Sequence, residues 1–183
     1  MMKAMIFGAA ILATATAAQA NDSAALAGAE AQQAYHAMVA FVATRVATRP
    51  TDSVVLAADA PLVKGNFVPC AAKPLAVIVA LDSAVRGDAA VPGAGHAIGE
   101  ARKAGVAVVF TTDRPASDAA AIGATLTTLK LGPAVAGDTL LTGGGGDVRR
   151  AAIAGKYCVI AAAGSRLSDF SDKFAAEHSE NLL

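Results

Sequence analysis

Tryptophan is absent from this 183-residue chain, and aromatic residues together make up only 4% of it. Charged residues are also few, at 16%, and 15 Lys and Arg balance 15 Asp and Glu, so the formal net charge is zero. Proteins that bind nucleic acids usually carry a basic surface with aromatic side chains among the basic ones. The sequence has neither feature, and we therefore expect no nucleic-acid partner.

Cysteine is scarce as well, with Cys70 and Cys158 as the two copies, and the three histidines are His36, His96 and His178. These five residues show none of the short ligand spacings of a zinc site, so the sequence predicts no metal centre. Two cysteines permit one disulfide in an oxidising compartment, although the sequence does not show that they meet.

The N-terminus has the composition of an export signal. Residues 1–22, "MMKAMIFGAAILATATAAQAND", contain one Lys, an apolar run from Ala4 to about Ala13, and the small-x-small triplet Ala18-Gln19-Ala20. We predict cleavage after Ala20, which leaves residues 21–183 as one periplasmic or secreted domain. The apolar run is too short to span a bilayer, so no membrane span is expected after cleavage. An uncleaved N-terminal anchor is the alternative.

Segments with helical and with extended periodicity alternate along the rest of the chain. We predict helices over residues 23–49 (with Ser23 as N-cap), 93–104, 115–130 and 147–154, and another from near Leu167. We predict strands over residues 75–81, 106–110, 139–141 and 157–163, with short extended pieces at 54–56 and 67–68. This alternation is typical of an α/β domain with a parallel sheet. Such sheets bind ligands beyond the carboxyl ends of their strands, so the residues that follow each strand are the candidates for function.

Three kinds of candidate follow the predicted strands. Asp82, Asp113 and Asp169 are acidic, but each also suits a turn or a helix cap. The glycine run 143–146 could cradle a phosphate or form a flexible loop, and it lacks the Lys-Ser/Thr pair of a phosphate-binding loop. Ser165 lacks the elbow motif and the evident base that a serine nucleophile needs.

Three stretches carry a resemblance to a known family: "AVIVALDSAV", "AAVPGAGHAIGEARKAGVAVVFTTDR" and "GGDVRRAAIAGKYCVIAAAGSRLSDF". In this order they resemble the motifs of class C acid phosphatases, secreted members of the haloacid dehalogenase-like superfamily. The resemblance covers about residues 74–172 and, more loosely, Gln32–Tyr35. It implies a three-layer, Rossmann-like domain of the haloacid dehalogenase type, with a central parallel sheet and an N-terminal helix. The connection from Asp82 to Pro92 is shorter than the family's, so the cap region would be largely absent and the site open.

The first of these stretches resembles the family's D-x-D-E-T motif. In that motif the first Asp attacks phosphorus and the second is the general acid/base. Asp82 matches the second Asp, whereas Ala80 stands at the nucleophile position. Ser83 stands at the Glu and Ala84 at the Thr. The resemblance therefore gives Asp82 the role of a remnant acid/base.

The other two stretches resemble the remaining motifs. In the T-N-R motif, Thr112 matches the phosphate-binding Thr, Asp113 stands at the Asn, and Arg114 matches the Arg. Gly146 stands where the family has its phosphate-binding Lys. Ser165 replaces one magnesium-binding Asp, and Asp169 is a remnant of the metal site. Further matching positions are Arg149, Arg150, Gly164, Leu167 and Phe170.

These substitutions bear on activity. Phosphoryl transfer through an aspartate needs that carboxylate and cations that neutralise the transferred group. Ala80, Gly146 and Ser165 supply neither. We therefore expect a non-catalytic pseudophosphatase with no cofactor, which binds a small phosphate-like anion or has a structural role. The alternative is an active acid phosphatase that uses Asp82 as a base for water, and only this alternative calls for Mg²⁺.

The resemblance also bears on the two cysteines. In this superfamily the first and last motif strands are neighbours in the sheet. Cys70 precedes the first of these strands and Cys158 lies in the last. A Cys70–Cys158 disulfide is the hypothesis that follows.

Overall fold

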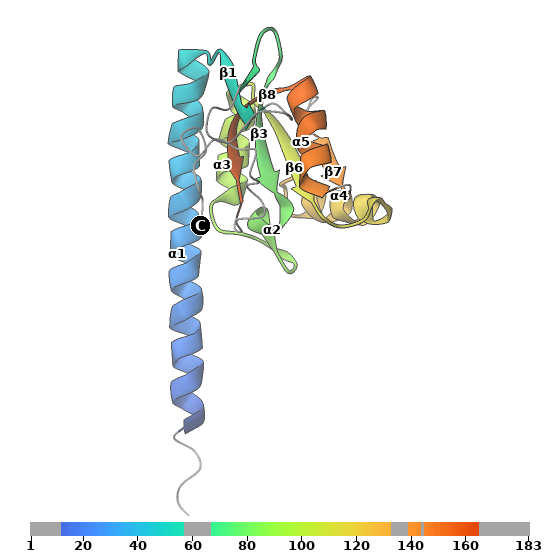
Figure 1. The fold of residues 1–183 in the computed structure, drawn as a ribbon. Coiled ribbons are helices and arrows are strands. Elements are labelled where there is room, and N and C mark those ends of the chain that lie inside the picture. The colour runs from blue at the N-terminus through green and yellow to red at the C-terminus, as the bar shows by residue number, and fades with distance from the viewer. Residues whose placement is uncertain (1–11, 57–66, 133–138, 144, 165–183) are drawn as a thin grey trace, which may run out of the picture.

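Four parallel strands in the order β7-β6-β3-β8 form the central sheet, and helices cover both of its faces (Figure 1). The computed structural model describes residues 12–56, 67–132, 139–143 and 145–164. The sheet strands are β3 (Leu75–Ala80), β6 (Ala107–Thr112), β7 (Thr139–Thr142) and β8 (Cys158–Ala163). The helices are α1 (Leu12–Thr48), α2 (Leu81–Ala84), α3 (Ala94–Lys103), the 3-10 helix η2 (Ala116–Asp118), α4 (Ala119–Thr128) and α5 (Gly145–Lys156).

Two small antiparallel pairs complete the described elements. The first joins β1 (Asp52–Leu56) to β2 (Phe67–Pro69). The second is a tight hairpin of β4 (Val85–Arg86) and β5 (Ala89–Ala90), which follows α2 directly. This hairpin lies in the segment for which the sequence predicted only an irregular connection.

The sheet is buried on both faces, as the short apolar strands predict. Along β3, Val77 and Val79 belong to a core cluster that also contains residues of α1, α3 and α4. Ala76 and Ile78 belong to a second cluster with residues of β1 and α5. Alternate side chains of one strand point to opposite faces, so these two clusters define three layers. The predicted α/β fold with a central parallel sheet is therefore confirmed.

Most predicted elements that fall on described residues are found within a few residues of their expected bounds. The segment predicted as one helix over 115–130 is divided into η2 and α4. Helix α5 begins at Gly145, two residues earlier than predicted, so Gly145 and Gly146 are helical rather than part of a flexible loop, and a phosphate cradle at this helix start remains a prediction. The later part of α5 packs on the sheet through Ile153, which is buried, and this contact stabilises a helix that starts in glycines.

Helix α1 is longer than predicted. It begins at Leu12, so Ser23 lies inside the helix and the prediction that Ser23 caps it was wrong. Residues 12–27 contain no Gly or Pro and are rich in alanine, the strongest helix former, which explains the continuous helix. The beginning of α1 extends beyond the rest of the domain in Figure 1. Cleavage after Ala20 would shorten this extension and remains a prediction.

The second half of α1 joins the core. Its residues Tyr35, Met38 and Val42 are buried against the sheet and α3. Gly93, the residue before α3, has φ of 86° and packs closely on α1, since a Cβ there would lie 3.0 Å from the Cβ of Tyr35. Within the described residues, no helix has the length and apolar character that crossing a membrane would require.

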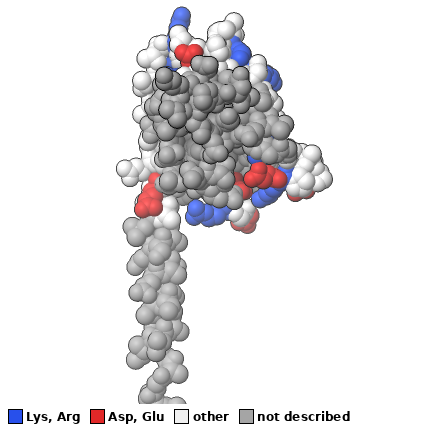
Figure 2. Space-filling view, in the orientation of Figure 1, with Lys and Arg blue, Asp and Glu red and all other residues white. Residues whose placement is uncertain are grey.

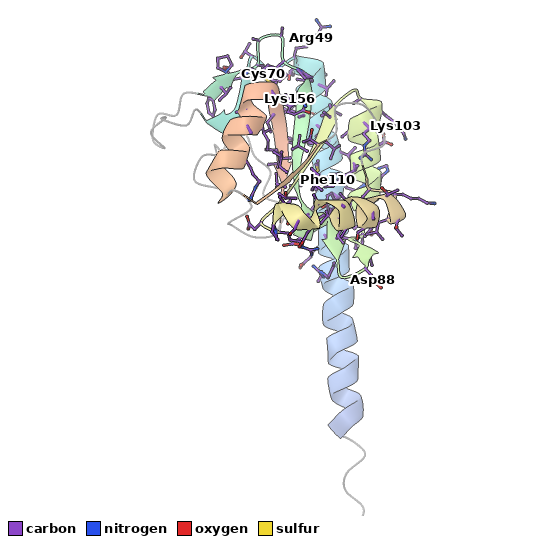
Figure 3. All side chains as sticks on the ribbon, turned by 90° about the vertical axis from the view of Figure 1, so that its right-hand side faces the viewer. Arg49, Cys70, Asp88, Lys103, Phe110 and Lys156 are labelled. Carbon is purple, nitrogen blue, oxygen red and sulfur yellow. A yellow bond between two sulfur atoms is a disulfide. The ribbon has the colours of Figure 1, made fainter. Side chains whose placement is uncertain are left out.

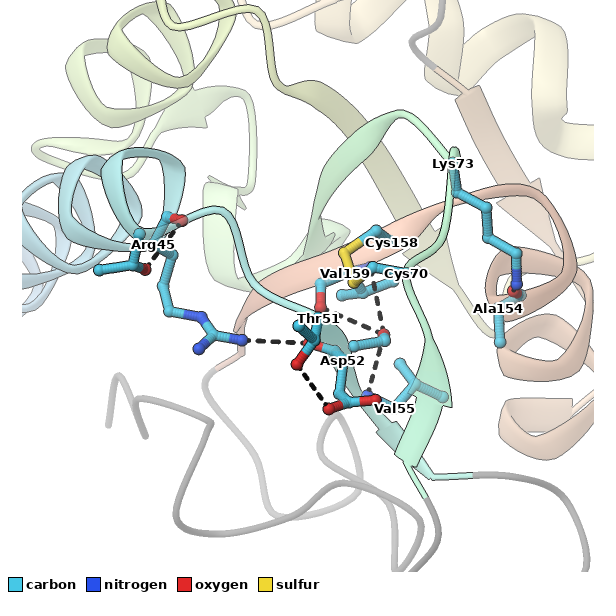
Figure 4. Close-up of a disulfide and its surroundings, with 11 residues drawn as sticks. Arg45, Thr51, Asp52, Val55, Cys70, Lys73, Ala154, Cys158 and Val159 are labelled. Carbon is cyan, nitrogen blue, oxygen red and sulfur yellow. Dashed lines mark hydrogen bonds between the residues drawn. A yellow bond between two sulfur atoms is a disulfide. The ribbon is translucent and has the colours of Figure 1, made fainter.

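A disulfide joins Cys70 to Cys158 at the amino edge of the sheet, with the two Cα atoms 4.6 Å apart (Figure 4). Cys158 is the first residue of β8 and pairs with Leu75, the first residue of β3. The hypothesis of a Cys70–Cys158 disulfide is therefore confirmed, as is the neighbouring position of these two strands. The disulfide is consistent with an oxidising compartment.

Candidate functional site

The carboxyl edge of the sheet begins where β3 ends, at Ala80. This residue is 6% exposed, and α2 follows it without a connecting loop. The buried Ser83 of α2 donates a hydrogen bond from Oγ to the Ala80 carbonyl oxygen, at 2.6 Å. The same Oγ lies 3.5 Å from the carbonyl oxygen of Ala163 on β8. Ser83 therefore ties the ends of two neighbouring strands together.

A cavity of about 190 Å³ opens at this edge, between α1 and the segment that follows β3. It is lined by small or apolar residues together with several polar ones: Ala27, Glu30, Ala31, Ala34, Tyr35, Asp82, Ser83, Arg86, Val91 and Gly164. Figure 2 shows acidic and basic side chains gathered along the corresponding lower rim of the domain, near the point where α1 extends from it. The cavity therefore combines an apolar wall with charged groups of both signs.

Tyr35 lines the cavity, although the sequence did not predict it as a site residue. Its hydroxyl donates a hydrogen bond of 2.8 Å to the carbonyl oxygen of Ser83, and the side chain is buried. Burial raises the pKa of this hydroxyl above its usual value, because the ionised form would lose its hydration. Tyr35 thus fixes α2 against α1 and forms part of the cavity wall. The sequence placed Tyr35 in the loosely matching segment Gln32–Tyr35 and did not predict this contact.

Asp82 and Arg114 face each other across the ends of β3 and β6. Arg114 Nη2 lies 3.9 Å from Asp82 Oδ1, and the two side chains are 57% and 45% exposed. The backbone N–H of Arg114 donates to Oγ1 of Thr112, at 3.3 Å. Thr112 is buried, so its hydroxyl supports the turn after β6. Asp82, at the predicted acid/base position, and Arg114, at a predicted binding position, are therefore neighbours in the structure.

Asp113 belongs to a separate ion pair. Arg149 of α5 donates from Nη2 to Asp113 Oδ1 and from Nη1 to the carbonyl oxygen of Gly143, both at 2.5 Å. The Arg149 side chain is only 12% exposed, and Gly143 N–H donates to the Arg114 carbonyl oxygen at 2.8 Å. This network joins α5 to the loops after β6 and β7. Arg149 matches a position of the resembled family, but its pairing with Asp113 could not be predicted because the two residues are 36 positions apart in the sequence.

The remaining predicted site residues are placed as follows. Gly146 lies in the first turn of α5, and Gly164 follows β8 and lines the cavity. Ser165, Asp169 and the helix predicted from Leu167 lie outside the described residues. In the part of the chain that the structure describes, no group of three or more His, Cys, Asp or Glu side chains could hold a metal ion.

Comparison with known proteins gives no family for this chain, since no protein-family model matches it and no curated protein is significantly similar to it. The fold that the structure shows is an α/β fold with a four-stranded parallel sheet.

Proposed function

We propose that this protein is a non-catalytic, phosphatase-like domain that binds a small phosphate-like anion at the carboxyl edge of its sheet. The proposal rests on which residues line the cavity. Among the described residues, the cavity at this edge is lined by Asp82 and Ser83 but not by Ala80, the position of the nucleophile in the family that the sequence resembles. The site thus offers a cavity for the proposed anion, but it lacks the carboxylate that would attack a phosphoryl centre.

Chemistry supports the non-catalytic part of the proposal. Ala80 has no nucleophilic atom, and Gly146 has no cationic side chain to neutralise a transferred phosphoryl group. The remaining carboxylate, Asp82, lies near the Arg114 guanidinium. A single carboxylate can serve as a base, but it does not supply the nucleophile and cations of the family's reaction.

The basic side chains at and beside the cavity support the proposed binding of an anion. Arg86 lines the cavity, and Arg114 lies beside the cavity residue Asp82. Guanidinium groups bind phosphate oxygens in a bidentate manner and remain charged at all physiological pH values. The carboxylate of Asp82 competes with an anion for these groups, so we expect weak binding to the native protein and tighter binding once Asp82 is neutralised.

The strand order supports the scaffold that the proposal assumes. The resemblance implies that the strands bearing the first and last motifs are neighbours, and β3 and β8 are neighbours in the sheet. The strand bearing the T-N-R-like motif, β6, lies on the other side of β3. The disulfide agrees with the predicted export of the protein.

Titration calorimetry with inorganic phosphate tests the proposal. We expect Arg114→Gln to weaken binding by about tenfold to hundredfold, because a charged hydrogen bond contributes roughly 1.5–3 kcal/mol. Arg49→Gln is the matched control, since it removes the same charge from the opposite end of the domain, where Arg49 is labelled in Figure 3. Asp82→Asn should strengthen binding severalfold.

Two results would contradict the proposal. The first is the absence of a binding signal at phosphate concentrations up to about 10 mM, where even an affinity near 1 mM would be evident. The second is an equal loss of affinity in Arg114→Gln and Arg49→Gln, which would show that phosphate responds only to net charge.

A further inference from the structure

Helices α1 and α3 run side by side and bring two histidines together that are far apart in the sequence. The imidazole rings of His36 on α1 and His96 on α3 have their centres 5.7 Å apart and are tilted by 48°. Both residues are exposed to solvent. The sequence spacing of these histidines predicted no metal ligation, because it could not show that α1 and α3 are adjacent.

We propose that His36 and His96 form a binding site for a divalent transition-metal ion such as Zn²⁺, Ni²⁺ or Cu²⁺, which bridges α1 and α3. Imidazole nitrogen is a preferred ligand of these ions. With Zn–N bonds of about 2.1 Å and tetrahedral geometry, two imidazoles on one ion have ring centres roughly 5 Å apart. The observed separation of 5.7 Å is close to this value, so rotation of the exposed rings suffices to direct one nitrogen of each toward a common ion.

The rigid support beneath the two rings favours such a site. Tyr35, next to His36, is buried, and so is Ala97, next to His96. Gly93, three residues before His96, packs on Tyr35, the residue next to His36, and this contact limits the distance between the two helices near the histidines. The ligands therefore project from packed helices, and binding does not require a loop to become ordered.

Both rings are exposed, so solvent can reach the ion, and among the described residues no third His, Cys, Asp or Glu completes the set of protein ligands. A groove of about 260 Å³ lies along the same α1–α3 seam and is lined by Val39 and Ala43 of α1 and by Glu100 of α3, among others. Glu100 is four residues after His96, on the same face of α3, but it forms an ion pair of 2.6 Å with Lys103 and is not counted as a ligand. Water molecules supply the remaining ligands, as they do in open zinc sites.

Titration of the purified, untagged protein with Zn²⁺ tests the proposal. We expect one equivalent of Zn²⁺ to bind and, at about 100 times the dissociation constant, to raise the unfolding midpoint by roughly 5–10 °C. His36→Gln and His96→Gln should each weaken binding by at least about tenfold, since each removes one of the two protein ligands. Electron paramagnetic resonance of the Cu²⁺ form should show two imidazole nitrogens.

His178→Gln is the matched control, and it should leave zinc affinity unchanged. Mg²⁺ should neither bind nor raise the unfolding midpoint, because it prefers oxygen ligands. Circular dichroism establishes that the variants are folded, which is expected because both histidines are exposed. Unchanged zinc affinity in folded His36→Gln and His96→Gln would overturn the proposal. So would no binding of Zn²⁺ up to about 1 mM, or loss of binding in His178→Gln alone.

Discussion

At its amino edge the sheet is closed by a disulfide between Cys70 and Cys158, and the Lys73 ammonium donates to the Ala154 carbonyl oxygen in the last turn of α5. At its carboxyl edge the sheet ends in a cavity, beside the exposed pair of Asp82 and Arg114. Cys70 and Asp88 mark these opposite ends of the domain in Figure 3.

The contrast indicates a division of roles between the two edges. A covalent bond closes the amino edge. The carboxyl edge also has buried hydrogen bonds, from Tyr35 and Ser83, but no cross-link among the described residues, and its Asp82–Arg114 pair is exposed and of small energy beside the cavity. Ligands of parallel α/β sheets bind at the carboxyl edge, so groups there are available to a ligand at little cost in stability. The predictions below test this division, starting from the largest expected effect.

Removing the disulfide should have the largest effect on stability. The cross-link joins residues 88 positions apart, so the double variant Cys70→Ser/Cys158→Ser should lose about 4 kcal/mol of unfolding free energy. Urea unfolding measures this loss, and the reduced native protein should be destabilised to a similar extent. A loss below about 1 kcal/mol would contradict the role given to the amino edge.

Ser53 should be the next most sensitive position. Its buried Oγ donates to the Val159 carbonyl oxygen at 3.1 Å, and it accepts from the backbone N–H groups of Val159 and Val55. Ser53→Ala leaves these backbone groups of β1 and β8 without their partner and should cost about 1–3 kcal/mol in urea unfolding. The exposed Ser117→Ala is the control and should change stability by less than about 0.5 kcal/mol. Equal effects of the two substitutions would contradict the assignment.

Tyr35→Phe should have a smaller effect that depends on pH. At neutral pH, loss of the hydrogen bond to Ser83 should cost about 1 kcal/mol. Burial raises the pKa of Tyr35 in the folded state, so above about pH 10 the unfolded chain loses this proton more readily than the folded one. Native stability therefore falls as pH rises through this range. The difference between native protein and Tyr35→Phe in urea unfolding should shrink there, and a constant difference would contradict this account.

Asp82→Asn should have the smallest effect on stability. Its partner Arg114 lies 3.9 Å away and both side chains are largely exposed, so the free energy of unfolding should change by less than about 0.5 kcal/mol. The same variant should alter phosphate affinity, as described above. A loss of stability as large as that of Ser53→Ala would show that the carboxyl edge contributes to stability as much as the amino edge.

The sequence predicted the elements whose signals are local. The apolar run of β3 and the helix predicted over 93–104 are both found in the structure, and Gly105, just after that helix, has φ of 75°. The β4–β5 hairpin was missed because its strands are only two residues long, although the Gly87-Asp88 turn between them is a hairpin signal. The start of α1 was misplaced because Ser23 suits a cap only where the preceding residues are not helical.

The candidate site was predictable only in part. Asp82 and Arg114 follow strands and Thr112 ends one, and the α/β pattern brings these positions to one edge because the carboxyl ends of parallel strands meet there. The Arg149–Asp113 pair and the Tyr35–Ser83 hydrogen bond join residues distant in the sequence. Such pairings depend on how helices pack on the sheet, and no local pattern of residue types specifies them.

The rate of hydrolysis of a chromogenic phosphomonoester, measured with and without Mg²⁺, tests most directly whether the carboxyl edge binds without catalysing. Native protein and Asp82→Asn should be compared at equal concentration, since Asp82 is the carboxylate that remains at this edge. The account predicts that both proteins show only the background rate under both conditions. Turnover by the native protein that requires Mg²⁺ and is abolished in Asp82→Asn would contradict it.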